Sequence, residues 1–108
     1  MLSQQNRLTK DKEIKTVLLR GRGLFNPFLT LKYRKTVAEK RFAVVVSTKV
    51  AKEAVRRNRL KRIIRETLKA RLNTIPLGEY VLICRPASAK AQEKDVLLGL
   101  NNLLSKLR

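Results

Sequence analysis

Residues 56–66, with the sequence RRNRLKRIIRE, constrain the fold more than any other stretch of the chain. They hold five arginines and one lysine in eleven positions, yet Leu60, Ile63 and Ile64 recur at the spacing of one helical face. Such a helix cannot be buried on all sides, because each buried cation needs a partner. A disordered basic tail would not keep the apolar period. The stretch therefore predicts an ordered helix that packs on a core and presents positive charge to a polyanion.

The rest of the chain is similarly basic. Its 108 residues carry 26 Lys and Arg against 8 Asp and Glu, a formal net charge of +18. A charge of this size attracts phosphate-rich partners and destabilises the free protein through self-repulsion. We therefore expect a nucleic acid as the partner, and neither a membrane nor a small-molecule substrate.

The length of the chain indicates a single domain, residues 1–108, with one modest core. The single cysteine, Cys84, excludes an internal disulfide, and its place in an apolar run predicts a buried, unreactive thiol. No stretch is long and apolar enough for a membrane span, and residues 1–7 lack the apolar centre of a signal peptide. The expected location is the reducing cytoplasm.

Hydrophobic periodicity and turn residues predict six elements. The first is a helix over about 9–20, with Thr9 as its N-cap and Gly21 at its end. Two strands follow, over 28–33 and 42–47, joined by a hairpin loop over 34–41. The basic helix over about 51–72, a strand over 79–85 and a helix from about 88 complete the order, and the last helix has a stripe of Leu97, Leu100, Leu104 and Leu107. This α-β-β-α-β-α order indicates a small α+β sandwich, one sheet with helices packed on it.

Helical geometry divides the basic helix into two faces. Asn58, Arg62, Arg65 and Lys69 fall in one narrow sector, which we call the basic wall. The residues expected on the inward side are Leu60, Ile63, Ile64, Thr67 and Leu68. Arginine grips phosphate through two hydrogen bonds, and Asn58 adds both a donor and an acceptor, so the wall can read shape as well as charge.

Two segments around the basic helix resemble the signature of the protein subunit of bacterial ribonuclease P. The sequence VSTK at 46–49 ends a predicted strand. Residues 49–66 resemble an RNR-type motif, in which AVRRNRLKRIIRE follows the pattern A-V-x-R-N-R-x-K-R-x-x-R-E. The flanking elements also follow the order of that family. The resemblance implies a ribosomal protein S5 domain 2-like fold, in which the basic helix lies in a left-handed βαβ crossover.

The resemblance also implies a function, that of a non-catalytic protein subunit of an endoribonuclease. Such a subunit binds ribonuclease P RNA and the 5′ leader of precursor tRNA, and assists removal of the leader to give mature tRNA 5′ ends. The chemistry and its Mg²⁺ are expected in the RNA, with no cofactor bound by the protein alone. The residues implied to contact RNA are Lys49, Lys52, Arg56, Arg57, Asn58, Arg59, Lys61, Arg62 and Arg65.

A cleft for the single-stranded leader is implied between the first helix and the sheet. Its expected residues are Ile14, Leu18, Phe28, Thr30 and Lys32, with Phe28, Thr30 and Lys32 on one strand face. Relatives often place aromatic residues where Ile14, Leu18 and Lys32 stand here. Ile14 and Leu18 fit plain core packing as well as the cleft. Ala51 and Lys52 replace a glycine that many relatives have before the basic helix.

The chain offers little for catalysis of its own. It has no histidine, and its eight acidic residues show no spacing typical of a metal site. Two other classes share its charge and size: a ribosomal or assembly protein that binds ribosomal RNA, and a DNA-binding regulator with the basic helix in a major groove. The second class normally has a short helix and turn before the recognition helix, whereas a predicted strand precedes it here.

Overall fold

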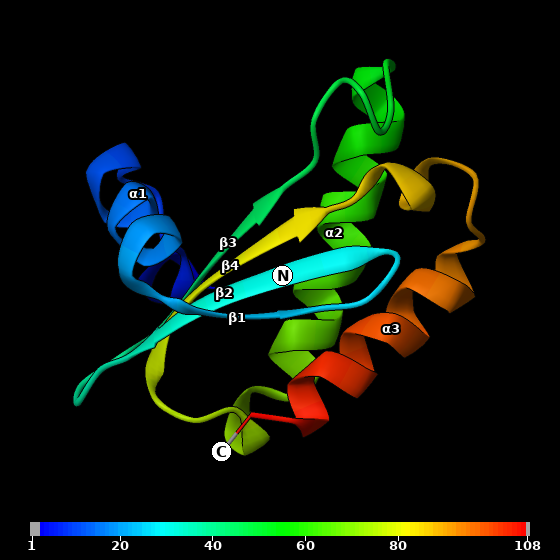
Figure 1. Cartoon of the computed structure of the whole chain (residues 1–108). Coiled ribbons are helices and arrows are strands. Elements are labelled where there is room, and N and C mark those ends of the chain that lie inside the picture. The colour runs from blue at the N-terminus through cyan, green and yellow to red at the C-terminus, as the bar shows by residue number, and fades with distance from the viewer. Residues whose placement is uncertain (1–2, 108) are drawn as a thin grey trace.

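A four-stranded β-sheet organises the structure, a computed structural model that describes residues 3–107 (Figure 1). Within those residues the elements follow in the order η1 (Gln4–Asn6), α1 (Asp11–Arg20), β1 (Arg22–Phe25), β2 (Leu29–Lys35), β3 (Lys40–Val45), α2 (Ala54–Ala70), η2 (Leu72–Thr74), β4 (Gly78–Cys84), η3 (Pro86–Ala89) and α3 (Glu93–Ser105), where η marks a 3-10 helix. The α+β class is confirmed, and β1 is an element that the sequence patterns missed. None of the described helices is long and apolar enough to cross a membrane.

The strands lie in the spatial order β1-β2-β4-β3. β1 pairs with β2, and β2 with β4, in antiparallel fashion, whereas β3 and β4 are parallel neighbours joined through α2. The predicted hairpin over 34–41 is therefore wrong, because β4 inserts between β2 and β3. The insertion is favourable because β4 is apolar on both faces: Tyr80, Val81 and Leu82 are all buried, as suits a central strand.

Helices cover both faces of the sheet. α2 and α3 pack on one face, where the larger core joins Leu29, Leu31, Phe42 and Tyr80 to the apolar sides of the two helices. α1 lies on the other face (Figure 1), over a smaller cluster of Leu8, Val17, Ala43 and Val81. The alternation of side chains along each strand thus serves two separate cores.

The first helix begins two residues later than expected. Thr9 is not its N-cap; Lys10 holds that place, and the Lys10 carbonyl accepts the first helical hydrogen bond, from Ile14 N at 3.0 Å. The reason is upstream, since Leu8 N donates to Phe42 O at 2.8 Å and holds this segment extended beside β3. Gly21 ends the helix as predicted. A glycine is required at this position because a Cβ would overlap the carbonyl oxygens of Val17 and Tyr33.

The other two helices are shorter than predicted. α2 buries Leu60, Ile64 and Leu68, while Ile63 and Thr67 are only partly buried. α3 begins at Glu93 and not near 88, because residues 86–89 form the short helix η3. Its predicted leucine stripe is confirmed at Leu100 and Leu104, with Leu97 partly buried against the core; Val96 and Leu103 are buried as well. Leu107 is also buried, but it lies beyond the end of α3 at Ser105.

Candidate nucleic-acid interface

The turn before α2 is held by an arginine of the helix itself. Val50 N and Ala51 N donate to Ser47 O at 3.1 and 3.2 Å, and the guanidinium of Arg57 donates to the carbonyls of Ala51 and Lys52 at 3.0 and 2.6 Å. Arg57 thereby satisfies carbonyls at the helix entrance. This contact stabilises the turn that contains Ala51 and Lys52.

Two further arginines of α2 tie it to the segment around the start of α3. Arg56 donates to the carbonyl of Ala89 in η3, and Arg59 Nε pairs with Glu93 at 2.6 Å. Both side chains remain exposed. An arginine has five N–H donors, so each of these guanidinium groups keeps donors free for a second partner.

The basic wall lies where helical geometry predicted it. Asn58, Arg62 and Lys69 are exposed on the side of α2 away from the buried Leu60 and Ile64. Arg62 makes a long contact with Glu66, 3.9 Å between exposed side chains, which holds it weakly. Asn58 and Arg62 line a shallow hollow of about 370 Å³ together with Val55 and Arg59. Lys49 and Lys52 are exposed in the loop before the helix, and Lys61 is partly buried on its flank.

Arg65, the remaining residue of the basic wall, is partly buried and lies near Arg7. The pKa of Arg65 is lowered, mainly because burial disfavours its charged form and further because Arg7 is positive. Arg7 pairs with Phe42 at the edge of β3, and its Nε is buried with no hydrogen-bond partner among residues 3–107. Sequence patterns missed Arg7, because its position depends on strand pairing with β3, far away in the chain.

The residues predicted for the leader cleft come together only in part. Thr30 and Lys32 lie on β2 opposite Ile83 and Val81 of β4, on the face that α1 covers. Ile14 is partly buried against the smaller core, and Leu18 of the same helix is 36% exposed. Phe28 packs against the larger core, so the structure does not group it with Ile14. Phe28 precedes β2, where Asn26 Oδ1 accepts bonds from Phe28 N and Leu29 N at 2.9 Å and sets the local turn.

An exposed aromatic residue lies on this side of the molecule. Phe25 is 71% exposed, it is paired with Thr30 across β1 and β2, and the guanidinium carbon of Arg85 lies 5.4 Å from its ring centroid. A cation above an aromatic ring holds that ring in place. Phe25 was missed because β1 is only four residues long, too short to show the alternation of a strand.

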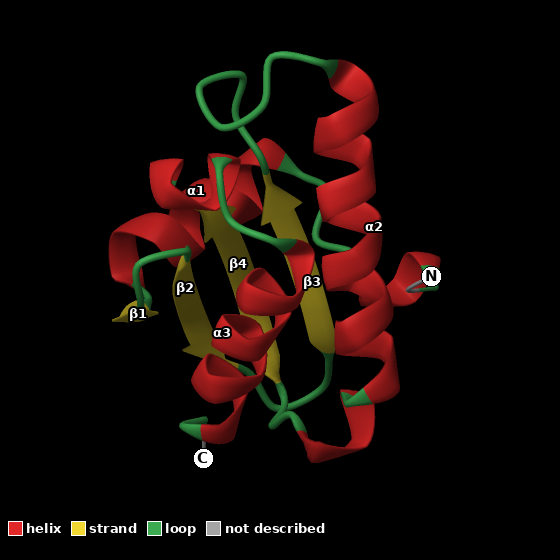
Figure 2. Ribbon diagram, turned by 90° about the vertical axis from the view of Figure 1, so that its right-hand side faces the viewer, coloured by secondary structure: helices red, strands yellow, loops and turns green. Residues whose placement is uncertain are grey.

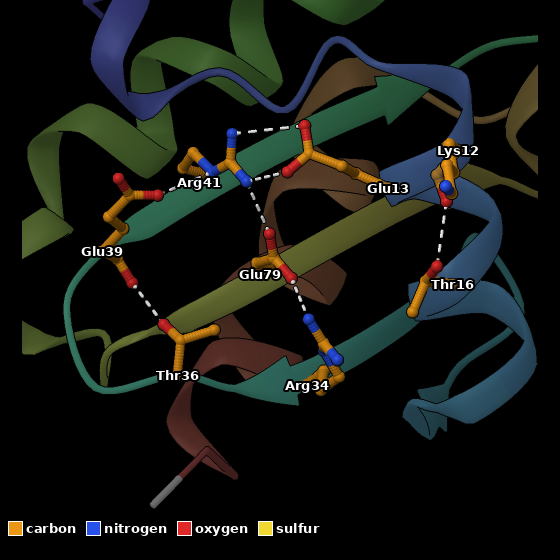
Figure 3. A network of polar contacts seen from close by, with 8 residues as sticks. All are labelled: Lys12, Glu13, Thr16, Arg34, Thr36, Glu39, Arg41 and Glu79. Carbon is orange, nitrogen blue, oxygen red and sulfur yellow. Dashed lines mark hydrogen bonds and ion pairs between the residues drawn. The ribbon is translucent and has the colours of Figure 1, made fainter.

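Acidic residues that look scattered in the sequence gather beneath α1. Glu79 of β4 is 5% exposed and binds Arg34 and Arg41 at 2.9 and 2.7 Å (Figure 3). Arg41 also binds Glu13 of α1, and its Nε lies 3.0 Å from Glu39 (Figure 3). Burial alone would raise the pKa of Glu79, but its bonds to the two arginines outweigh burial and lower it. These ion pairs fix α1 on the sheet.

No metal centre is formed by histidine, cysteine or acidic residues within 3–107, where no three of them come together in a suitable cluster. Cys84 is buried as predicted, and burial raises the pKa of its thiol to about 11 despite a hydrogen bond with Ser88. The described residues thus offer cations, amides and apolar side chains as the functional groups of the surface.

Comparison with known proteins gives a consistent result. A family model described as Ribonuclease P matches residues 2–108. The ribonuclease P protein component of Clostridium botulinum (strain Langeland / NCTC 10281 / Type F) is 36% identical over 106 residues, covering 95% of each chain. That of Xanthomonas campestris pv. campestris (strain B100) is 37% identical over 81 residues, covering 75% of this chain but 55% of the relative. The chain therefore spans about half the length of the Xanthomonas relatives that it matches.

Solved structures show the same fold. The RNase P protein from Thermotoga maritima has a TM-score of 0.83 and 28% identity, over 94% of this chain and 97% of that one. The RNase P protein of Staphylococcus aureus has a TM-score of 0.87 at 22% identity, with 93% of each chain covered.

Proposed function

The chain belongs to the ribonuclease P protein family, and from this membership we propose that it is the protein subunit of a ribonuclease P. In this role it binds the catalytic RNA and the 5′ leader of precursor tRNA, and assists endonucleolytic removal of the leader in the cytoplasm. The left-handed sense of the β3–α2–β4 crossover and its likeness to ribosomal protein S5 domain 2 are part of the same proposal.

The basic wall is the observation that carries this proposal. A helix with Leu60, Ile64 and Leu68 buried presents Asn58 and Arg62 to solvent in one direction. The docked helix cannot rotate its charges away, so the packing of α2 fixes the direction of the wall before RNA arrives. A fixed array of cations and one amide on a single face supports recognition of a folded RNA over mere attraction of any polyanion.

We propose that the RNA-contacting residues divide into two groups. The first group contacts the RNA with side chains that make few contacts within the protein. Its members are Lys49, Lys52, Asn58, Lys61, Arg62 and Arg65. Arg56, Arg57 and Arg59 hold the helix entrance and the start of α3, and offer their remaining donors to RNA. Arg7 joins the first group, since a phosphate beside Arg7 and Arg65 would offset the repulsion between their charges.

We propose that the leader runs over the sheet face beside α1. Thr30 and Lys32 contact its backbone from β2, and Leu18 and Ile14 border the cleft from α1. Phe25 supplies a base-stacking surface at the sheet edge in place of the missing aromatics of the helix. Phe28 contributes by supporting β2 from the core.

We assign the chemistry to the RNA. Phosphodiester hydrolysis needs an activated nucleophile and stabilisation of developing charge. The carboxylates that gather in the structure, Glu13, Glu39 and Glu79, are bound to arginines. Mg²⁺ is expected to act through the RNA subunit. The protein lowers the repulsion between the phosphate backbones of the RNA strands, so that cleavage needs less salt or magnesium.

Reconstitution with a bacterial ribonuclease P RNA tests the proposal. At low magnesium, purified protein should restore leader cleavage of precursor tRNA by that RNA, and excess ribosomal RNA should compete weakly. An Arg62→Gln variant should need more magnesium for the same rate. Leader cleavage by protein freed of RNA, or no stimulation of the RNA at any magnesium concentration, would refute the proposal.

A further inference from the structure

A second cationic pocket lies away from the basic wall, at the end of the β1–β2 pair. Four of its lining residues are Arg20, Arg22, Arg34 and Lys35, and the hollow has a volume of about 260 Å³. Arg20 is the last residue of α1, Arg22 the first of β1, and Arg34 and Lys35 the last two of β2. The fold therefore brings together four cations from three elements.

Gly21 sets the geometry of this pocket. The glycine lets the end of α1 approach the carbonyl of Tyr33 in β2, a place where any Cβ would overlap two carbonyl oxygens. The chain then turns directly from Arg20 into Arg22. The two arginines are thus fixed next to the end of β2 by backbone packing, so the cluster is not a chance meeting of flexible side chains.

The charge of the pocket is poorly compensated. Arg34 binds Glu79 at 2.9 Å, but no carboxylate within residues 3–107 forms an ion pair with Arg20, Arg22 or Lys35. Arg22 lies opposite Tyr33, so Arg22 and Lys35 are diagonal neighbours on one face of the sheet. Like charges at such positions repel, and a bound anion would offset this repulsion.

The pocket and the basic wall are on opposite edges of the sheet. β1 is the outermost strand on one side, and α2 lies beside β3 on the other (Figure 2). Three strand spacings of about 4.8 Å separate β1 from β3, roughly 14 Å in all. One phosphate group cannot reach both sites. The hollow is also smaller than the roughly 300–1,000 Å³ typical of sites for drug-sized ligands, which favours a phosphate or a single nucleotide.

From these observations we infer that Arg20, Arg22, Arg34 and Lys35 form a second RNA-binding site, which takes a backbone phosphate of an RNA segment separate from the one on the basic wall. The inference rests on the proposed RNA-binding function. The phosphate belongs either to the catalytic RNA or to precursor tRNA, and binding each RNA separately distinguishes the two sources.

The test compares three full-length variants with the unaltered protein. Arg22→Gln with Lys35→Gln removes two pocket charges. Lys94→Gln with Lys106→Gln removes two exposed charges, one near each end of α3, as a matched control. Arg62→Gln reports on the basic wall. Binding of ribonuclease P RNA alone and of precursor tRNA alone is measured across salt concentrations, and thermal melts verify that each variant is folded. The pocket variant should lose one to two units of salt slope for one RNA, in addition to any loss seen for the control.

The outcomes separate this inference from the proposed function. A slope of the pocket variant equal to that of the α3 control for both RNAs would overturn the second site, whatever Arg62→Gln does. A loss confined to one RNA identifies that RNA as the source of the phosphate. An unaltered protein that bound neither RNA would refute the proposed function and this site together.

Discussion

Arg65 of α2 lies near Arg7 of the N-terminal segment, and neither has an acidic partner within residues 3–107. Burial and the charge of Arg7 both lower the pKa of Arg65. Two guanidinium groups held in this way are expected where a phosphate completes the arrangement.

Arg7→Gln should therefore weaken binding to ribonuclease P RNA and reduce its salt slope by about one, as for a lost phosphate contact. The free protein should keep its melting temperature or gain slightly, because a like-charge repulsion is removed. Binding across salt concentrations and a thermal melt check both expectations. A lower melting temperature with an unchanged slope would make Arg7 a purely structural residue.

Arg57 and Arg62 should respond differently to the same substitution. Arg57→Gln loses two hydrogen bonds to the carbonyls of Ala51 and Lys52, at about 1 kcal/mol each, so chemical denaturation should show lower stability. Arg62→Gln should leave stability unchanged and reduce the salt slope by about one, because its ion pair with Glu66 is a weak one at 3.9 Å. Equal effects of both variants on stability would contradict this division.

Ile64→Ala should destabilise the protein by roughly 2–5 kcal/mol, since the side chain is fully buried on the inward face of α2. Ile63→Ala, one residue earlier and only partly buried, is the matched control and should cost clearly less. Urea unfolding gives both values. If the two costs are the same, the orientation of α2 is not the one described.

Glu79 should make stability fall in acid. Its folded pKa is lowered, so its stabilising effect is complete above the unfolded pKa of about 4.3 and is lost as the pH falls through the lower folded value. Glu79→Gln should be less stable at neutral pH and should show a shallower loss of stability below about pH 4.3. Unfolding measured from pH 7 to pH 2 tests this, and parallel curves for both proteins would contradict it.

Phe25→Ala should weaken binding of precursor tRNA by about 1–3 kcal/mol, the typical contribution of one aromatic ring stacked on a base. Phe25→Tyr keeps the ring and should bind normally. Because the ring is proposed to contact the leader, mature tRNA should bind both variants equally. A similar loss with mature tRNA would move Phe25 out of the leader path. Stability should hardly change, since the side chain is 71% exposed.

Local periodicity was a good guide to the faces of the helices. The inward and outward sides of α2 follow from 3.6 residues per turn, and Leu60, Ile64 and Leu68 are buried as expected while Asn58 and Arg62 are not. Such a prediction needs only one element and a core to pack on. The burial of Cys84 followed from its apolar neighbours in the same way.

Features that depend on distant pairing were not predictable. The insertion of β4 between β2 and β3 depends on strand association across the whole chain, and nearest neighbours in sequence suggested a hairpin instead. Arg7 reaches Arg65 only because Leu8 bonds to Phe42. The role of Arg57 at the helix entrance was hidden as well, because a guanidinium that binds RNA and one that binds its own backbone look alike in sequence.

The central position of β4 also orders events during synthesis. Among the described residues before β4, 3–77, β3 pairs only through the isolated bridge between Arg7 and Phe42, since β2 lies on the far side of β4. A nascent chain must therefore release its basic helix from the ribosome before its sheet can close around residues 78–84. Until then α2 lacks two of the elements on which it packs, β4 and α3, so the position of its arginines is fixed only after those elements are made.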